Sequence, residues 1–339
     1  MMIYKFAFIF ITQILFFVNV TFCNENVDEG NDFIFHHISD DYKYTFFETE
    51  FNGKECNATI YLPIILITKQ GFKIFSSRKL YGNSGEKLSY DGFFINDNNK
   101  IESMDNIKFI DISITKNVLA IFFSAILLII LLCICSLWYY LSRKNCVPSG
   151  FVAAVEVVFL YICEDIIKPN LGEKYKEYLP YLMTLFFFIL INNLLGLLPG
   201  AANVTGDISV TACLAIVTFL YTNINGNKHY WEHTFKPDVP KFLYPIMIPI
   251  EFISLFTKPF TLLIRLFANM TSGHIILLSI INLGFMFQSY FAGSCGVLIN
   301  CFMIILKIVV AFLQAYIFTL LSAIYIGGAV KDEHKHENN

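Results

Sequence analysis

Three ionisable residues stand at a spacing of seven within one long apolar stretch of this chain. Glu251, Lys258 and Arg265 all lie inside Tyr244–Phe287. On an α-helix this spacing keeps side chains on one slowly drifting face, and Asn269 continues that face. An ionisable group inside an apolar helix is costly and by default marks a path for ions or protons. The stripe therefore indicates ion or proton transfer through a membrane.

A second apolar stretch, Val297–Ala329, repeats the pattern with Asn300, Lys307 and Gln314, again seven apart. Arg265 has no matched acid in its own chain, since Glu251 would be about 21 Å away along a straight helix. One alternative is that the charges only form internal ion pairs that hold the helices together. The missing acid favours another interpretation, in which the partner of Arg265 belongs to a different subunit.

The elements that position these residues are membrane helices. The chain has 339 residues, of which 56% are hydrophobic and 15% charged, and its net charge of −3 gives no reason to expect a nucleic-acid partner. Long uncharged runs predict an all-α polytopic membrane protein with five spanning helices. Besides the two stretches above, the predicted spans are Val118–Leu141, Leu179–Leu198 and Ile208–Ile224. Gly150–Ile167 carries three acidic residues and predicts one amphipathic helix, lying in the interface or packed against other helices.

The last two spans are too long to stand upright. As continuous helices they would measure about 66 Å and about 50 Å, whereas the hydrocarbon core is only about 30 Å thick. We therefore predict a tilted hairpin with its turn near residues 288–296. Counting from residue 292 places Asn269 and Gln314 at similar depth, and brings His274 towards Lys307 nearer the outer side.

The chain ends give the orientation. Residues 1–23 predict a signal peptide, with an uncleaved first span as the alternative, and 24–116 a small exterior, periplasmic segment with β-like pieces such as "ATIYLPIILIT". Residues 117–330 form the predicted membrane domain, and 331–339 a cytoplasmic tail. Basic residues fall on the side of that tail, as the positive-inside rule requires. His36 and His37 lack further ligands nearby, so we predict no metal and no cofactor.

Longer motifs resemble a known family. "KPFTLLIRLFANMTSGHIILLS" and "AFLQAYIFTLLSAIYIG" resemble the two signature helices of subunit a of the F-type ATP synthase. "FFFILINNLLGLLPGAANVTGDISVT" is similar to its middle spans, and "FIFHHISD" and "SITKN" to a bacterial form with a long N-terminus. The resemblance implies a non-catalytic stator subunit in the bacterial inner membrane. Its partners would be the c-subunit ring, the b subunits of the peripheral stalk and the rest of the complex.

The resemblance also implies roles for single residues. Arg265 would face the carboxylates of the c-subunit ring, and because arginine stays protonated it would attract them without relaying protons. Asn269, His274 and Gln314 would belong to the outer half-channel, whose wall includes Asn193. Glu251 and Lys258 would lie towards the cytoplasmic exit.

One position departs from the family. Seven residues before the glutamine the family usually has Glu or His, and this chain has Lys307. A buried lysine can exchange its proton near neutral pH, so a relay, a weakened channel and a side chain pointing away all stay open. The alternative function is a self-contained ion channel or transporter, although inverted repeats are not evident. A membrane hydrolase would need motifs that the chain lacks. The sequence does not decide between proton and sodium.

Overall fold

The computed structural model describes most of the chain. The described residues are 40–51, 54–69, 71–81, 88–96, 99–104, 108–141, 148, 150–197, 203–235, 244–286 and 290–330. The predicted signal peptide, the pair His36–His37 and the predicted tail at 331–339 lie outside them.

The described N-terminal part folds into small antiparallel sheets. Strand β1 (Lys43–Phe51) pairs with β2 (Lys54–Tyr61), β3 (Pro63–Thr68) lies between β4 (Gly71–Ser76) and β7 (Phe109–Asp111), and β5 (Phe93–Ile95) pairs with β6 (Ile101–Ser103). The piece "ATIYLPIILIT" forms the end of β2 and all of β3, so its predicted β character is confirmed.

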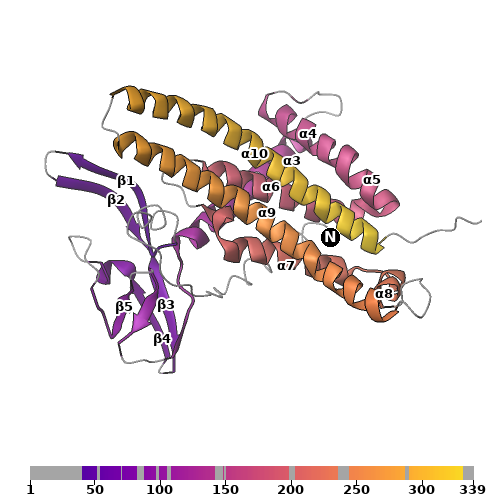
Figure 1. Cartoon of the computed structure of the whole chain (residues 1–339), viewed down its shortest axis with the longest axis horizontal. Coiled ribbons are helices and arrows are strands. Elements are labelled where there is room, and N and C mark those ends of the chain that lie inside the picture. The colour runs from indigo at the N-terminus through magenta and orange to yellow at the C-terminus, as the bar shows by residue number, and fades with distance from the viewer. Residues whose placement is uncertain are drawn as a thin grey trace, which may run out of the picture.

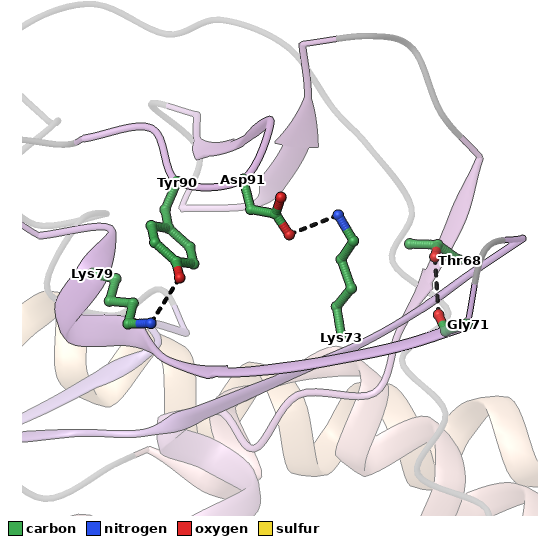
Figure 2. Close-up of polar contacts among 6 residues, drawn as sticks. All are labelled: Thr68, Gly71, Lys73, Lys79, Tyr90 and Asp91. Atoms are coloured by element: carbon green, nitrogen blue, oxygen red, sulfur yellow. Dashed lines mark hydrogen bonds and ion pairs between the residues drawn. The ribbon is translucent and has the colours of Figure 1, made fainter.

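Alternation along β3 gives this part its core. Ile64 and Leu66 are completely buried, whereas their neighbours face the other side of the sheet. At the end of the strand the Thr68 hydroxyl donates to the Gly71 carbonyl at 2.9 Å, across the turn into β4 (Figure 2). Lys73 on β4 reaches the carboxylate of Asp91 at 2.7 Å. The N-terminal part, which the sequence predicts to be exterior, thus has its own hydrophobic core, with polar contacts at its edge.

The membrane part is helical. Its first elements are α3 (Lys116–Leu141), α6 (Tyr175–Gly196), α7 (Ile208–Ile224) and α8 (Lys228–Phe235). Among the described residues, four helical stretches are long and apolar enough to cross a membrane, and α7 is a shorter apolar helix. With 17 residues, α7 is about 26 Å long, slightly less than the hydrocarbon core. The predicted polytopic, mainly α-helical architecture is confirmed.

The predicted amphipathic helix continues into the next span. Helix α4 (Phe151–Tyr161) runs through a π-helical turn, η2 (Ile162–Ile167), into the short α5 (Lys168–Leu171) and the 3₁₀ turn η3 (Gly172–Lys174) before α6 begins. One side of this segment is buried, and the ring of Tyr161 stacks on that of Tyr316 in the last helix, α10 (Tyr290–Val330), at 6.0 Å. The segment therefore packs along a membrane helix.

The last two helices are the longest. Helix α9 (Tyr244–Met286) has 43 residues and α10 (Tyr290–Val330) has 41, and they lie side by side (Figure 1). The turn predicted at 288–296 is therefore wrong in extent, because α10 already begins at Tyr290. Glycine and serine in "FAGSCG" suggested a loop, but a membrane offers no water to an open backbone and favours a continued helix. For the same reason α9 continues through Pro249 and Pro259.

A single apolar core joins these helices. Its completely buried members include Leu182 and Phe186 of α6, Leu266 of α9 and Ala315 of α10. In Figure 1, β1 and β2 lie at the end of the molecule where α9 finishes and α10 begins, and α8 lies at the opposite end. The hairpin thus runs from the exterior sheets to α8, and its two halves have different surroundings.

Candidate functional site

The predicted site residues lie along the α9–α10 hairpin. We call residues 269–314 its turn half, and residues 244–264 together with 315–330 its α8 half. Arg265 lies between the two halves. It follows the buried Leu262 and precedes the buried Leu266, and its own side chain is half-buried. Within the described residues no carboxylate forms an ion pair with it. The structure therefore gives Arg265 the isolation that the sequence predicts.

Asn269 and Gln314 meet at the start of the turn half. The Asn269 amide donates to the Gln314 Oε1 atom at 2.6 Å, which joins α9 to α10. Gln314 is only 2% exposed, and its amide nitrogen has no hydrogen-bond partner among the described residues. Counting from residue 292 predicts this pairing, and the contact confirms it. A buried amide with one free donor can hold water or another polar group.

Asn193 joins a third helix to the same region. It is fully buried on α6, donates to the Ala311 carbonyl at 3.3 Å, and accepts from the Thr205 hydroxyl at 2.8 Å. Thr205 belongs to the 3₁₀ turn η4 (Val204–Gly206), and the carbonyl of Gly206 accepts from Thr271 of α9 at 3.1 Å. Amide and hydroxyl groups therefore connect α6, η4, α9 and α10 around the turn half.

Lys307 has an unusual environment in the turn half. Its ammonium nitrogen is buried and has no hydrogen-bond partner among the described residues. Its stem crosses α9 at Gly273, where an added Cβ would lie 2.9 Å from the Lys307 Cε atom. His274 is the next residue along α9. The predicted approach of Lys307 to the His274 region is therefore confirmed at the level of the α9 backbone. The side chain of His274 lies outside the described part.

The α8 half contains Glu251 and Lys258. The ammonium of Lys258 lies 5.8 Å from the ring centre of Tyr230 on α8 and 5.7 Å from that of Tyr325 on α10. Burial, together with the charge of Glu251, raises the pKa of Tyr230. Tyrosines of two other helices thus flank Lys258.

Sequence reasoning missed several of these groups. The quoted motifs include Thr205 and Thr271 but single out neither, and Tyr230 lies outside them, because the importance of all three comes from contacts with distant segments. Tyr325 could have been found, since Lys258 and Tyr325 are almost equally far along the chain from residue 292. The same counting that pairs Asn269 with Gln314 pairs these two.

A further polar contact links the exterior part to the membrane helices. The backbone of Asn117, at the start of α3, donates to the Asp40 carboxylate at 3.0 Å, and its side chain donates to Asp207 at 2.9 Å. Asp207 in turn caps α7 by accepting from Ser209 at 2.8 Å. Burial, together with the nearby charge of Asp207, raises the pKa of Asp40 to about 6.

Both parts of the chain are similar to known families. Residues 121–327 match the family described as ATP synthase A chain, and residues 33–118 match a domain of unknown function, DUF8433. The chain is 44% identical to "ATP synthase subunit a" of Chloroherpeton thalassium, covering 66% of this chain and 68% of that protein. It is 49% identical to the protein of the same name from Chlorobium phaeobacteroides, over 66% and 67% of the two chains. A third relative, from an Anaeromyxobacter, is 40% identical over 68% and 57%.

Proposed function

The chain belongs to the ATP synthase A chain family, and we propose that it forms the two proton half-channels of that complex and carries their separating arginine. Membership makes it subunit a of an F-type ATP synthase, a multi-pass protein of the bacterial inner membrane. Its stator role follows from the family, and the assignment of channels and residues is our proposal.

The isolation of Arg265 carries the proposal. A half-buried guanidinium in a membrane helix needs an anionic partner, and the described residues offer none. A carboxylate on each subunit of a rotating c ring would supply that partner in turn. Because arginine keeps its proton, it can attract each carboxylate but cannot pass protons between the half-channels. The ring must then rotate to connect them.

The two halves of the hairpin supply the half-channels. We assign Asn269, Gln314, Asn193 and His274 to the outer one, together with Lys307. The direct Asn269–Gln314 contact at 2.6 Å and the free amide nitrogen of Gln314 support this assignment. We assign Glu251 and Lys258 to the inner one, which leads to the cytoplasm at the α8 end.

Partners and orientation follow from the same proposal. The c ring would lie against Arg265, and the b subunits of the peripheral stalk would hold the stator. Residues 24–116 would lie outside the cytoplasm after removal of the signal peptide 1–23. The membrane domain would then be 117–330, and the tail 331–339 would be cytoplasmic. The position of β1 and β2 at the turn end of the hairpin supports this arrangement (Figure 1).

Replacing the arginine tests the proposal. We expect Arg265→Ala and Arg265→Lys to abolish ATP-driven proton pumping in membrane vesicles while the complex still assembles, since neither side chain reproduces a permanently charged, planar guanidinium. Lys168→Ala is the matched control, because it removes an exposed cation that pairs with Glu164 at 3.2 Å outside the hairpin. Normal pumping in either arginine variant would refute the proposed role.

The alternative of a self-contained channel makes a different prediction. If the chain conducted ions alone, the purified subunit in liposomes would carry a current that Arg265→Ala changes. We expect no such current, because half-channels end at a ring that the isolated chain lacks. Hydrolytic activity of the isolated chain would instead favour an enzyme.

A further inference from the structure

Lys258 is held by aromatic rings and not by an acid. Its ammonium lies within 6 Å of two ring centres, those of Tyr230 and Tyr325, at 5.8 and 5.7 Å. No carboxylate in the described residues forms an ion pair with it. The face of an aromatic ring attracts a cation through its quadrupole, and the attraction strengthens where water is excluded. Two rings can therefore hold this charge without neutralising it.

The two rings come from different elements. Tyr325 belongs to α10, within the hairpin, whereas Tyr230 belongs to α8, the short helix between α7 and α9. The Tyr230 hydroxyl donates to Asn223 of α7 at 3.3 Å. Burial, and then the charge of Glu251, raise the pKa of Tyr230. Tyr230 thus lies within reach of both acidic and basic groups that we assign to the inner half-channel.

A small cavity opens beside the ammonium. Its volume is about 10 Å³, and its lining includes Thr218, Thr222, Asn223 and Lys258 together with the two tyrosines. A cavity needs roughly 10–15 Å³ and at least two polar partners to hold one water. Four of the lining residues, Thr218, Thr222, Asn223 and Lys258, have a polar side chain. Lys258 and the two tyrosines near its ammonium therefore line the same cavity.

We propose that Tyr230 and Tyr325 are positioning residues that clamp the Lys258 ammonium beside this cavity, so that the cation orders water in the inner half-channel. The inference rests on the proposed function, since it gives Lys258 its place on the proton path. It adds a role for Tyr325, which lies within the motif "AFLQAYIFTLLSAIYIG", and a contact from Tyr230 of α8, which lies outside the quoted motifs. The tyrosines act through Lys258 and do not themselves carry protons.

Substitution by leucine removes the aromatic ring but keeps a bulky apolar side chain, whereas substitution by phenylalanine keeps the ring. We expect Tyr325→Leu and Tyr230→Leu each to slow passive proton flow through membranes stripped of the catalytic sector by about threefold to tenfold, whereas Tyr→Phe at either position stays within about twofold because the ring face is kept. Tyr316→Leu is the matched control, since this α10 tyrosine stacks on Tyr161 away from Lys258. Rates are taken per assembled complex.

The second arm asks whether the tyrosines act through Lys258. In a Lys258→Met background, Tyr325→Leu should cause no further loss, because interacting residues are not additive. Should the leucine variants assemble poorly, fluorinated phenylalanine at position 325 weakens the ring face with little change of size. The rate should then fall with added fluorine only when Lys258 is present.

Three results would overturn the clamp. The first is that Tyr325→Leu slows proton flow equally with and without Lys258. The second is that the leucine and phenylalanine variants have equal rates of proton flow. The third is that Lys258→Met has a normal rate of proton flow. Each of these leaves the proposed function standing if Arg265→Ala is inactive in the same preparation. Active Arg265→Ala, in contrast, refutes the function itself.

Discussion

The turn half and the α8 half of the hairpin both contain polar side chains within apolar helices, but they hold these side chains in different ways. In the turn half, the neutral side chains of Asn269 and Gln314 contact each other directly at 2.6 Å, and beside it Thr205 and Asn193 do so at 2.8 Å. In the α8 half, the Lys258 ammonium of α9 lies near the rings of Tyr230 on α8 and Tyr325 on α10. Neutral hydrogen bonds fix geometry, because each buried partner is costly to lose.

A charged side chain near aromatic rings is restrained differently from a neutral hydrogen-bonded pair. An ammonium can be attracted by an aromatic ring from several directions, so its position is restrained less tightly than by a hydrogen bond. The comparison therefore teaches that the turn half is built for fixed geometry and the α8 half for a charge held by aromatic rings. Loss of one amide should harm function more than loss of one ring.

Among the residues that test this comparison, the largest effect is expected for Gln314. Gln314→Leu removes the acceptor of the Asn269 amide and replaces a polar side chain that is only 2% exposed, and we expect ATP-driven proton pumping to fall at least about tenfold, equivalent to about 1.4 kcal/mol. Gln314→Glu keeps an oxygen acceptor and should retain more activity. Ser322→Ala serves as control, since this buried α10 hydroxyl bonds only its own helix at Phe318 among the described residues. If Gln314→Leu pumped as well as the control, the fixed-geometry view of the turn half would be wrong.

A smaller, local effect is expected at the contact between the exterior part and the helices. The folded-state pKa of Asp40, about 6, is above the ordinary 3.8. Protonation therefore favours the folded contact, whose stabilisation is complete below about pH 4 and is lost as the pH rises through about 6. The difference is at most about 3 kcal/mol. The Asp40→Asn substitution should remove this dependence of stability on pH.

Amide hydrogen exchange of residues 112–117 in the assembled complex measures this. At pH 8 the Asp40→Asn variant should exchange more slowly than the parent, and near pH 4 the two should agree. The charged groups around Asp40 are Asp41, Lys116 and Asp207, so Asp41→Asn is the matched control. Equal exchange of parent and Asp40→Asn at pH 8 would mean that burial of this carboxylate does not weaken the contact.

The smallest effect is expected at Lys307. We expect Lys307→Glu to pump as well as the parent or better, because it places a readily titrating group where the ammonium is buried and without a partner among the described residues. ATP-driven quenching of a pH-sensitive dye measures the rate. Gly273→Ala should be tolerated too, since the atom it would meet belongs to a flexible side chain. Complete loss of pumping in Lys307→Glu would show that the lysine has a specific role of its own.

Much of the membrane part was predictable because the length and periodicity of a membrane helix depend only on its own segment of sequence. Bilayer thickness and helix period identified the spans, and counting from the turn paired Asn269 with Gln314. The extent of that turn was not predictable, since "FAGSCG" contains residues that break helices in water. The exterior sheets were predicted only as β-like pieces, because their register depends on contacts across the strands.

What the sequence by itself determined is the class, the family and the charged stripe of α9, because hydropathy, motif and spacing are properties of one continuous segment. What only the tertiary structure decided are the contacts between segments: the rings of Tyr230 and Tyr325 at Lys258, Thr205 at Asn193, and Gly273 under Lys307. These depend on how the helices pack and rotate against each other. Packing is set by the whole core at once, so no single stretch of sequence contains it.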